Sequence, residues 1–196
     1  MIGAVVLAAG RSQRMGRPKM TLPWGDTTVI RQVVSVLLSA GVDDVKVVTG
    51  GARDDVESAL AGIPVSTVFN PDFGKSEMML TLQVGLAALN KDINAALVVL
   101  GDQPQIEIPV VKSILAAYEQ GTHAIVVPSY QLRRGHPWLV DRDLWDVLLE
   151  KNAHITMRQF LDQYEENIQY VNVNTPSILQ DLDTPEDYLH FQFPEI

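Results

Sequence analysis

A short segment near the N-terminus changes from apolar to basic and is the first candidate for chemistry. The apolar run stops at Gly10, and a second glycine follows at Gly16. The same segment holds four cationic side chains, namely Arg11, Arg14, Arg17 and Lys19. Glycines let a backbone approach a phosphate closely, and N–H groups beyond the end of a strand can bind an anion. The segment predicts a phosphate-binding loop neutralised by Arg14 and Lys19, with a solvated basic turn as the alternative.

The spacing of this loop excludes two common nucleotide motifs. A Walker A loop requires GxxxxGK[ST], whereas "GRSQRMG" has five residues between its glycines and the lysine comes three positions later. The GxGxxG fingerprint of dinucleotide-binding proteins is also missing. A different class of phosphate loop is therefore expected.

Two acidic segments are further candidates. Asp102 follows an apolar run in "LVVLGDQPQI", where it could hold Mg²⁺, a cation that takes one or two protein carboxylates, or could simply cap a turn. In "QDLDTPEDY", Thr184 or Asp183 could cap a helix that begins at Pro185. A metal-ligand role for Asp183 is compatible with capping but does not follow from a single carboxylate.

These candidates need a scaffold, and the chain alternates β-branched runs with segments of helical period. The expected strands are Gly3–Leu7, Val45–Thr49, Val65–Phe69, Ala95–Leu100, Ala124–Val127 and Gln169–Val173. The expected helices are 29–38, 54–60, 77–89, 110–118, 144–149 and 157–164, with another from Pro185. Strands apolar on both faces belong in a parallel sheet covered on both sides. The pattern predicts an α/β, three-layer Rossmann-like fold with a mostly parallel central sheet, with 128–137 as a loop over its edge.

Composition limits the function classes. The chain has 196 residues, 46% of them hydrophobic, and no linker or repeat, so residues 1–196 are expected to form a single domain. Lys and Arg number 15 against 24 Asp and Glu, a formal net charge of −9, which argues against a nucleic-acid partner. There is no cysteine, no secretory signal and no run of ~18 apolar residues. We expect a cytoplasmic protein that binds neither nucleic acid nor membrane.

Five motifs together resemble the molybdenum cofactor nucleotidyltransferases, within the wider group of MobA-like NTP transferases. The motifs are "LAAGRSQRMGRPK" at 7–19, "NPDFGKS" at 70–76, "GDQP" at 101–104, "RRGHP" at 133–137 and "DLDTPEDY" at 181–188. The resemblance implies a nucleotidyltransferase domain that transfers a nucleoside monophosphate from an NTP to the terminal phosphate of molybdopterin or the molybdenum cofactor. Pyrophosphate would be released, and a molybdoenzyme would receive the product.

The resemblance also implies roles for individual residues. The nucleotide-binding residues would be Leu7, Ala8, Ala9, Gly10, Arg14, Lys19, Asn70, Ser76 and Gly101. The catalytic residues would be Arg14, Lys19 and Asp102, with Asp102 and Asp183 as ligands of Mg²⁺. The acceptor-binding residues would be Arg133, Arg134, Gly135 and His136.

Some details of the resemblance concern the substrates. "LAAG" is similar to the cytidylyltransferase branch, so CTP is the expected NTP, and "RRGHP" is similar to that branch as well. The chain departs from the family at Met78 and Met79, where small or hydroxylated residues are usual, so the pocket there could differ. It departs again at 151–161, where Arg158 could match a family arginine but a Gly-Asp-rich motif is missing.

The expected chemistry does not require a histidine. A phosphate monoester has a second pKa of about 6 and is already a dianion at neutral pH, so it needs no general base. His136 could then either bind the acceptor or have a structural role, and the three tryptophans are expected to bury apolar surface. Two alternatives remain open: a nucleotidyltransferase for a sugar phosphate or another small phosphorylated alcohol, and a non-catalytic cofactor chaperone for a molybdoenzyme.

Overall fold

The computed structural model describes residues 1–10, 12, 15–75, 78–150 and 155–192. Arg14 and Ser76 lie outside the described residues. The strands within these ranges are β1 (Ile2–Ala8), β2 (Pro23–Trp24), β3 (Thr27–Thr28), β4 (Asp44–Thr49), β5 (Ser66–Phe69), β6 (Ala95–Leu100), β7 (Ile125–Tyr130), β8 (Arg133–Arg134), β9 (Trp138–Asp141) and β10 (Ile168–Asn172).

The helices fall between these strands. The α-helices are α1 (Val29–Ala40), α2 (Arg53–Ala59), α3 (Met78–Ala88), α4 (Ile108–Glu119), α5 (Trp145–Leu149), α6 (Met157–Gln163) and α7 (Pro185–Gln192). Short 3₁₀ turns are η2 (Lys19–Thr21), η3 (Phe73–Lys75), η4 (Arg142–Leu144), η5 (Glu165–Asn167) and η6 (Pro176–Leu179). None of the helices in the described ranges has both the length and the apolar character needed to cross a membrane.

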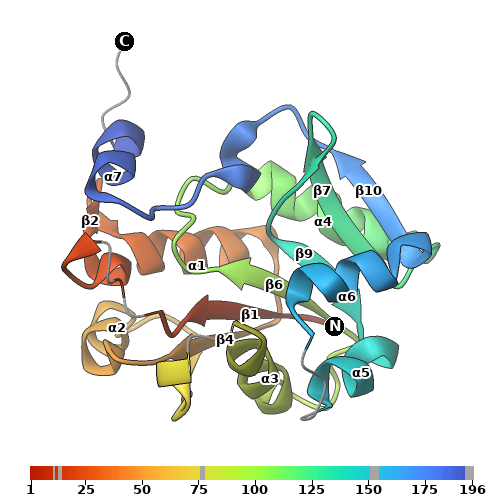
Figure 1. The fold of residues 1–196 in the computed structure, drawn as a ribbon, viewed down its shortest axis with the longest axis horizontal. Coiled ribbons are helices and arrows are strands. Elements are labelled where there is room, and N and C mark those ends of the chain that lie inside the picture. The colour runs from red at the N-terminus through yellow and green to blue at the C-terminus, as the bar shows by residue number, and fades with distance from the viewer. Residues whose placement is uncertain (11, 13–14, 76–77, 151–154, 193–196) are drawn as a thin grey trace.

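One central sheet organises the chain. Its strand order is β10-β7-β9-β6-β1-β4-β5, with β8 paired to β7. All neighbouring pairs along this order are parallel except those that involve β9, which runs antiparallel to both β6 and β7. Figure 1 shows helices on both sides of the sheet. The expected α/β fold, with a mostly parallel sheet between two helical layers, is confirmed.

The two faces of the sheet bury alternate residues of the same strands. Ala4 and Val6 of β1 pack into a cluster with α1 and α4, whereas Val5 and Leu7 pack into a second cluster with α3, α5 and α6. A strand buried on both faces is apolar throughout, because successive side chains point to opposite sides. The apolar run of β1 therefore holds this strand between two helical layers and fixes where its carboxyl end emerges.

Gly85 allows α3 to lie close to the sheet. A Cβ atom at this position would overlap the side chain of Val5 and would lie 2.9 Å from Cγ2 of Val48. Only glycine permits this close approach of a helix to β1 and β4.

The interpretation of 128–137 as a loop was wrong. β7 continues through Pro128 to Tyr130, and Arg133–Arg134 return as β8 in an antiparallel pair with it. Pro128 lacks an N–H group, but its carbonyl still accepts a hydrogen bond from Gly135 N at 3.0 Å. The sequence analysis also missed β9, whose four residues are inserted between β6 and β7.

Candidate active site

The predicted phosphate loop leaves the carboxyl end of β1. Ala8 and Ala9 are buried, and the chain reaches the surface at Gly10. The loop returns at Lys19, whose backbone N–H donates to Ser12 Oγ at 3.1 Å. Its position beyond the central strand is the one where open α/β sheets bind ligands.

A pocket of about 420 Å³ lies between this loop and the segments that follow β4 and β5. It is lined by Gly10, Ser12, Gly16, Arg17, Pro18, Gly51, Ala52 and Phe73. The sequence analysis did not single out Gly51, Ala52 or Phe73. The glycine pair Gly50–Gly51, directly after an expected strand, was the available signal, because it repeats the strand-then-glycine pattern of the first loop.

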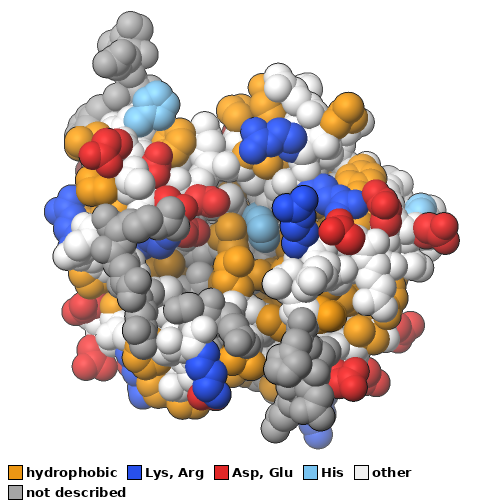
Figure 2. Space-filling model, in the orientation of Figure 1, with side chains coloured by type: hydrophobic (Ala, Val, Ile, Leu, Met, Phe, Trp, Pro, Cys, Tyr) orange, Lys and Arg blue, Asp and Glu red, His pale blue; other side chains and the backbone are white. Residues whose placement is uncertain are grey.

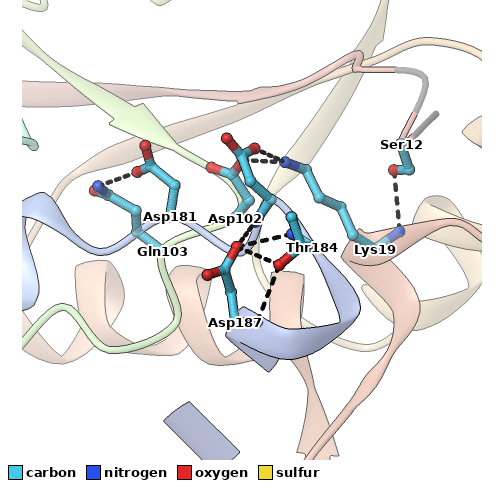
Figure 3. A network of polar contacts seen from close by, with 8 residues as sticks. Ser12, Lys19, Asp102, Gln103, Asp181, Thr184 and Asp187 are labelled. Carbon is cyan, nitrogen blue, oxygen red and sulfur yellow. Dashed lines mark hydrogen bonds and ion pairs between the residues drawn. The ribbon is translucent and has the colours of Figure 1, made fainter. Parts of the chain in front are cut away.

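Next to this pocket, Lys19 joins two carboxylates from distant parts of the chain. Its Nζ forms an ion pair with Asp102 and another with Asp183 Oδ1 at 3.3 Å. Asp102 follows β6, and Asp183 precedes α7, so both acidic segments reach the end of β1. Figure 3 shows the Lys19 side chain pointing toward Asp102. The sequence predicted the three residues separately, and the fold brings them together.

The two carboxylates of this cluster stabilise the charged form of Lys19. Burial by itself lowers the pKa of Lys19, but the Coulombic attraction and hydrogen bonds of Asp102, followed by those of Asp183, raise it above its ordinary value. The ammonium is therefore held in its charged form. The side chains of Lys19 and Asp102 are only 11% and 16% exposed, so water screens this attraction weakly.

The donor set fits a hard divalent cation. Two carboxylates from separate segments already converge on one positive charge, and Mg²⁺ is commonly held by one or two carboxylates together with substrate phosphates. Within the described ranges, no group of three or more His, Cys, Asp or Glu side chains is arranged to hold a metal ion. A metal here would depend on the bound nucleotide for further ligands.

Thr184, and not Asp183, caps α7. Thr184 Oγ1 accepts a hydrogen bond from Asp187 N at 3.2 Å, and Asp187 Oδ2 accepts one from Thr184 N at 2.8 Å. This reciprocal pair satisfies N–H groups at the start of the helix. The carboxylate of Asp183 is thereby left to face Lys19.

A third carboxylate, Asp181, lies beside the pair and was not predicted as a site residue. Its Oδ1 accepts a hydrogen bond from Gln103 Nε2 at 2.6 Å. Partial burial, followed by the negative charge of Asp102, raises the pKa of Asp181 to about 6. Figure 3 shows Gln103 and Asp181 next to Asp102, and Figure 2 shows acidic side chains gathered beside the central hollow of this face.

The segment predicted to bind the acceptor contains one exposed and one fully engaged arginine. Arg133 is exposed. Arg134 donates to Tyr170 Oη at 2.7 Å, to Asp162 Oδ1 at 2.6 Å and to Glu165 Oε1 at 2.9 Å. These contacts join β8 to β10, α6 and η5, so Arg134 is engaged by neighbouring side chains, whereas Arg133 is exposed.

Gly135 and His136 pack against η6. A Cβ at Gly135 would lie 2.5 Å from the carbonyl oxygen of Ile178, and His136 N donates to that oxygen at 3.0 Å. The ring nitrogen Nε2 of His136 is buried and accepts or donates no hydrogen bond among the described residues. Burial lowers the pKa of His136 to about 4, so the imidazole is neutral at physiological pH.

The remaining predicted residues have more local contacts. Asn70 is 1% exposed; its side chain donates to Thr81 Oγ1 at 3.1 Å and accepts from Asp72 N at 2.9 Å, which fixes the turn after β5. Gly101 donates its N–H to Leu7 O at 3.1 Å. Met79 packs in the core beneath α3, whereas Met78 is exposed.

Two of the three tryptophans lie in the core, and Arg158 lies at the surface. Trp138 and Trp145 are buried, as expected, and Trp24 is partly buried against Tyr188. Arg158 is exposed on α6.

The sequence matches a family model over most of its length. Residues 4–168 match the MobA-like NTP transferase domain. The chain belongs to this family. It is a nucleotidyltransferase with a Rossmann-like fold, and the predicted resemblance to the MobA-like group is confirmed.

Relatives of this MobA-like chain span its full length. It is 25% identical over 192 residues to a molybdenum cofactor cytidylyltransferase from Escherichia coli (strain K12), covering 96% of this chain and 94% of that one. It is 28% identical over 192 residues to nicotine blue oxidoreductase from Paenarthrobacter nicotinovorans, covering 94% and 93%.

A solved structure of Rv0371c from Mycobacterium tuberculosis H37Rv superposes with a TM-score of 0.86, at 29% identity and 97% coverage of both chains. Another structure of Rv0371c, a complex with manganese, superposes with a TM-score of 0.78 at 27% identity, covering 99% of both chains.

Proposed function

We propose that this transferase uses Mg²⁺ and CTP to transfer a cytidylyl group to the terminal phosphate of molybdopterin or the molybdenum cofactor, with release of pyrophosphate. The observation that carries the proposal is the cluster of Lys19, Asp102 and Asp183 beside the glycine-lined pocket. The pocket has the position expected for a nucleotide. With a divalent cation held by its two carboxylates, the cluster would have the positive charge needed at the phosphates.

The reaction needs alignment and charge neutralisation more than proton transfer. An oxygen of the acceptor phosphate attacks the α-phosphorus, a P–O bond to it forms, and the bond from the α-phosphorus to the bridging oxygen breaks. The electron pair leaves with pyrophosphate. Lys19, and Arg14 by its predicted role, would offset the negative charge that accumulates. Bound Mg²⁺, held by Asp102 and Asp183, would neutralise phosphate oxygens and favour departure of pyrophosphate.

The choice of CTP depends on the small side chain of Ala9 and on the cytidylyltransferase relative. Ala9 is buried at the end of β1, and its carbonyl and Cα lie close to Gly50, next to the pocket. Its methyl would take space beside the base that a glycine leaves open. A difference of this size in a pocket is worth about 1–3 kcal/mol, or roughly 10- to 200-fold in kcat/KM.

Two observations support molybdopterin or the molybdenum cofactor as the acceptor. One is the exposed Arg133, in the same segment as His136, which resembles the pterin-facing motif. The other is the named activity of the Escherichia coli relative. We extend the proposal to delivery of the product to a molybdoenzyme. A sugar phosphate remains the alternative acceptor, because it would use the same nucleotide half of the site.

Pyrophosphate release tests the proposal. CTP, GTP, ATP and UTP are each paired with molybdenum cofactor and with a sugar 1-phosphate, using wild type and Ala9→Gly. We expect CTP with molybdenum cofactor to give the highest kcat/KM in wild type, and Ala9→Gly to narrow the gap to GTP. Faster turnover with the sugar phosphate would favour the alternative acceptor. Binding of cofactor without pyrophosphate release from any NTP would favour the chaperone hypothesis.

A further inference from the structure

One buried amide connects the two acidic segments without being part of the chemistry proposed above. Gln103 follows Asp102 directly and is 1% exposed. Its Nε2 donates to Asp181 Oδ1 at 2.6 Å and lies 3.5 Å from the carbonyl oxygen of Ile178. A buried hydrogen bond to a carboxylate is among the stronger interactions in a protein.

A backbone hydrogen bond runs beside this amide. Leu182 N donates to the carbonyl oxygen of Asp102 at 3.1 Å. Residues 102–103 are thus joined to residues 181–182 by two adjacent bonds, and Asp183 is the next residue along. The separation of the Asp102 and Asp183 carboxylates therefore depends on this pair of contacts.

Electrostatics make the side-chain contact more important than the backbone one. Asp102, Asp181 and Asp183 place three carboxylates close to the single ammonium of Lys19. The amide donor of Gln103 gives Asp181 a partner within this acidic group. Without that donor, repulsion would favour movement of residues 181–183 away from β6.

We propose that Gln103 is a positioning residue for the metal site: its hydrogen bond to Asp181 holds the Asp102 and Asp183 carboxylates at the separation that a divalent cation requires. This inference rests on the proposed metal-dependent function. Direct hydrogen-bond partners of metal ligands have this effect elsewhere, and their replacement typically weakens metal binding 10- to 100-fold. Gln103 acts one residue further out, through Asp181, so we expect the lower end of that range.

The same contact reaches the predicted acceptor segment. The carbonyl oxygen of Ile178 lies within reach of Gln103 Nε2 and also accepts the hydrogen bond of His136 N at 3.0 Å. η6 thus connects residues 102–103 and 181–183 to the predicted acceptor segment, 133–137. A substitution at Gln103 is therefore expected to affect both the metal site and the acceptor segment.

The test is Mn²⁺ binding, followed by electron paramagnetic resonance in the presence of an α,β-methylene analogue of CTP. Gln103→Glu places a carboxylate against Asp181, and we expect it to weaken Mn²⁺ binding about 10-fold. The double variant Gln103→Glu with Asp181→Asn exchanges donor and acceptor, and we expect it to recover most of the affinity.

Two controls separate positioning from other effects. Gln180→Glu adds the same charge next to Asp181 without replacing the amide donor, and we expect it to bind Mn²⁺ as wild type does. The thermal unfolding midpoint is measured for every variant, because a purely structural role would lower that midpoint and leave Mn²⁺ affinity unchanged. If Gln103→Glu does not fold, Gln103→Met removes the donor without adding a charge and carries the test.

Asp102→Asn separates this inference from the function on which it rests. Unchanged Mn²⁺ binding by Asp102→Asn would overturn the metal site itself. Loss of binding by Asp102→Asn, combined with wild-type affinity in Gln103→Glu, would overturn only the positioning role. A failure of the double variant to recover affinity would do the same.

Discussion

At the scale of single residues, the site depends on one cation shared by two anions. Lys19 contacts both Asp102 and Asp183. The pairing of β1 with β6 brings Lys19 close to Asp102, and the hydrogen bond from Leu182 N to the carbonyl oxygen of Asp102 brings Asp183 to the same place. The sequence could identify each of these residues as a candidate, because each follows a strand or precedes a helix. Their meeting on one ammonium required the fold.

Asp102→Asn tests the charge at this point. The amide keeps the shape of the side chain but loses the negative charge, so we expect turnover to fall by at least 100-fold. The chain still folds, but loss of the buried ion pair with Lys19 lowers the unfolding free energy by about 1–3 kcal/mol. Steady-state kcat/KM at several magnesium concentrations, together with urea unfolding, measures both effects. Near-wild-type turnover at limiting magnesium would rule out the metal-ligand role.

His136 predicts a pH dependence of stability. Its folded pKa of about 4 lies below the ordinary value of 6.5, so the unfolded chain binds the proton more tightly. Above pH 6.5, His136 is neutral in both the folded and the unfolded chain, and the fold has its full stability. As the pH falls from 6.5 toward 4, the unfolded chain takes up the proton first, and the free energy of unfolding falls by about 1–3 kcal/mol.

Replacement by glutamine removes this titration. We expect the difference in unfolding free energy between wild type and His136→Gln to change by about 1–3 kcal/mol between pH 7.5 and pH 4. Denaturant unfolding at both pH values gives the number, with the exposed His123→Gln as the control for loss of an imidazole. The same difference at both pH values would contradict the assignment.

At the scale of elements, two glycines determine how closely neighbouring helices and strands pack. α3 lies against β1 and β4 because residue 85 has no side chain, and β8 lies against η6 because residue 135 has none. The periodicity of the sequence predicted most strands and helices to within a few residues. It did not predict β9, because Trp138–Asp141 is short and follows Pro137, and a four-residue run gives too little pattern to distinguish a strand from a loop.

Gly85→Ala tests the close approach of α3. The added Cβ would overlap the side chain of Val5, so we expect a loss of about 1–3 kcal/mol of unfolding free energy. Val5→Ala in the same chain makes room and should recover part of the loss. Gly10→Ala is the matched control for stability, because a Cβ there meets nothing within 4 Å. Equal urea midpoints for Gly85→Ala and wild type would show that the helix moves without cost.

At the scale of the whole molecule, the pocket and the predicted acceptor segment lie at different strands of one sheet. The pocket is built from the segments that follow β1, β4 and β5, and the acceptor segment connects β7 to β9. The acidic segment 181–183 contacts both the loop after β6 and Lys19. Sequence motifs could assign residues to the two halves of the site, but η6, which connects the halves, has no signature of its own.

Arg133→Ala tests this separation. Its exposed guanidinium is available to an anionic acceptor and belongs to a different segment from the nucleotide pocket, so we expect KM for the acceptor to rise about 10-fold while the Kd for CTP is unchanged. Steady-state kinetics and titration calorimetry measure the two quantities. Arg134→Ala is the comparison, and we expect it to lower stability through its lost contacts to Asp162 and Glu165. Weaker CTP binding with an unchanged acceptor KM in Arg133→Ala would reverse the two half-sites.

The insertion of β9 between β6 and β7 has a consequence for synthesis on the ribosome. β6 is complete at Leu100, but the strand that pairs with its outer edge ends only at Asp141. These 41 residues take roughly 2–8 s to translate at 5–20 residues per second. Throughout that interval an apolar strand has unsatisfied N–H and C=O groups along one side, a template for pairing with other nascent chains. Protection by a ribosome-associated chaperone is thus most valuable to this protein between the emergence of residue 100 and that of residue 141.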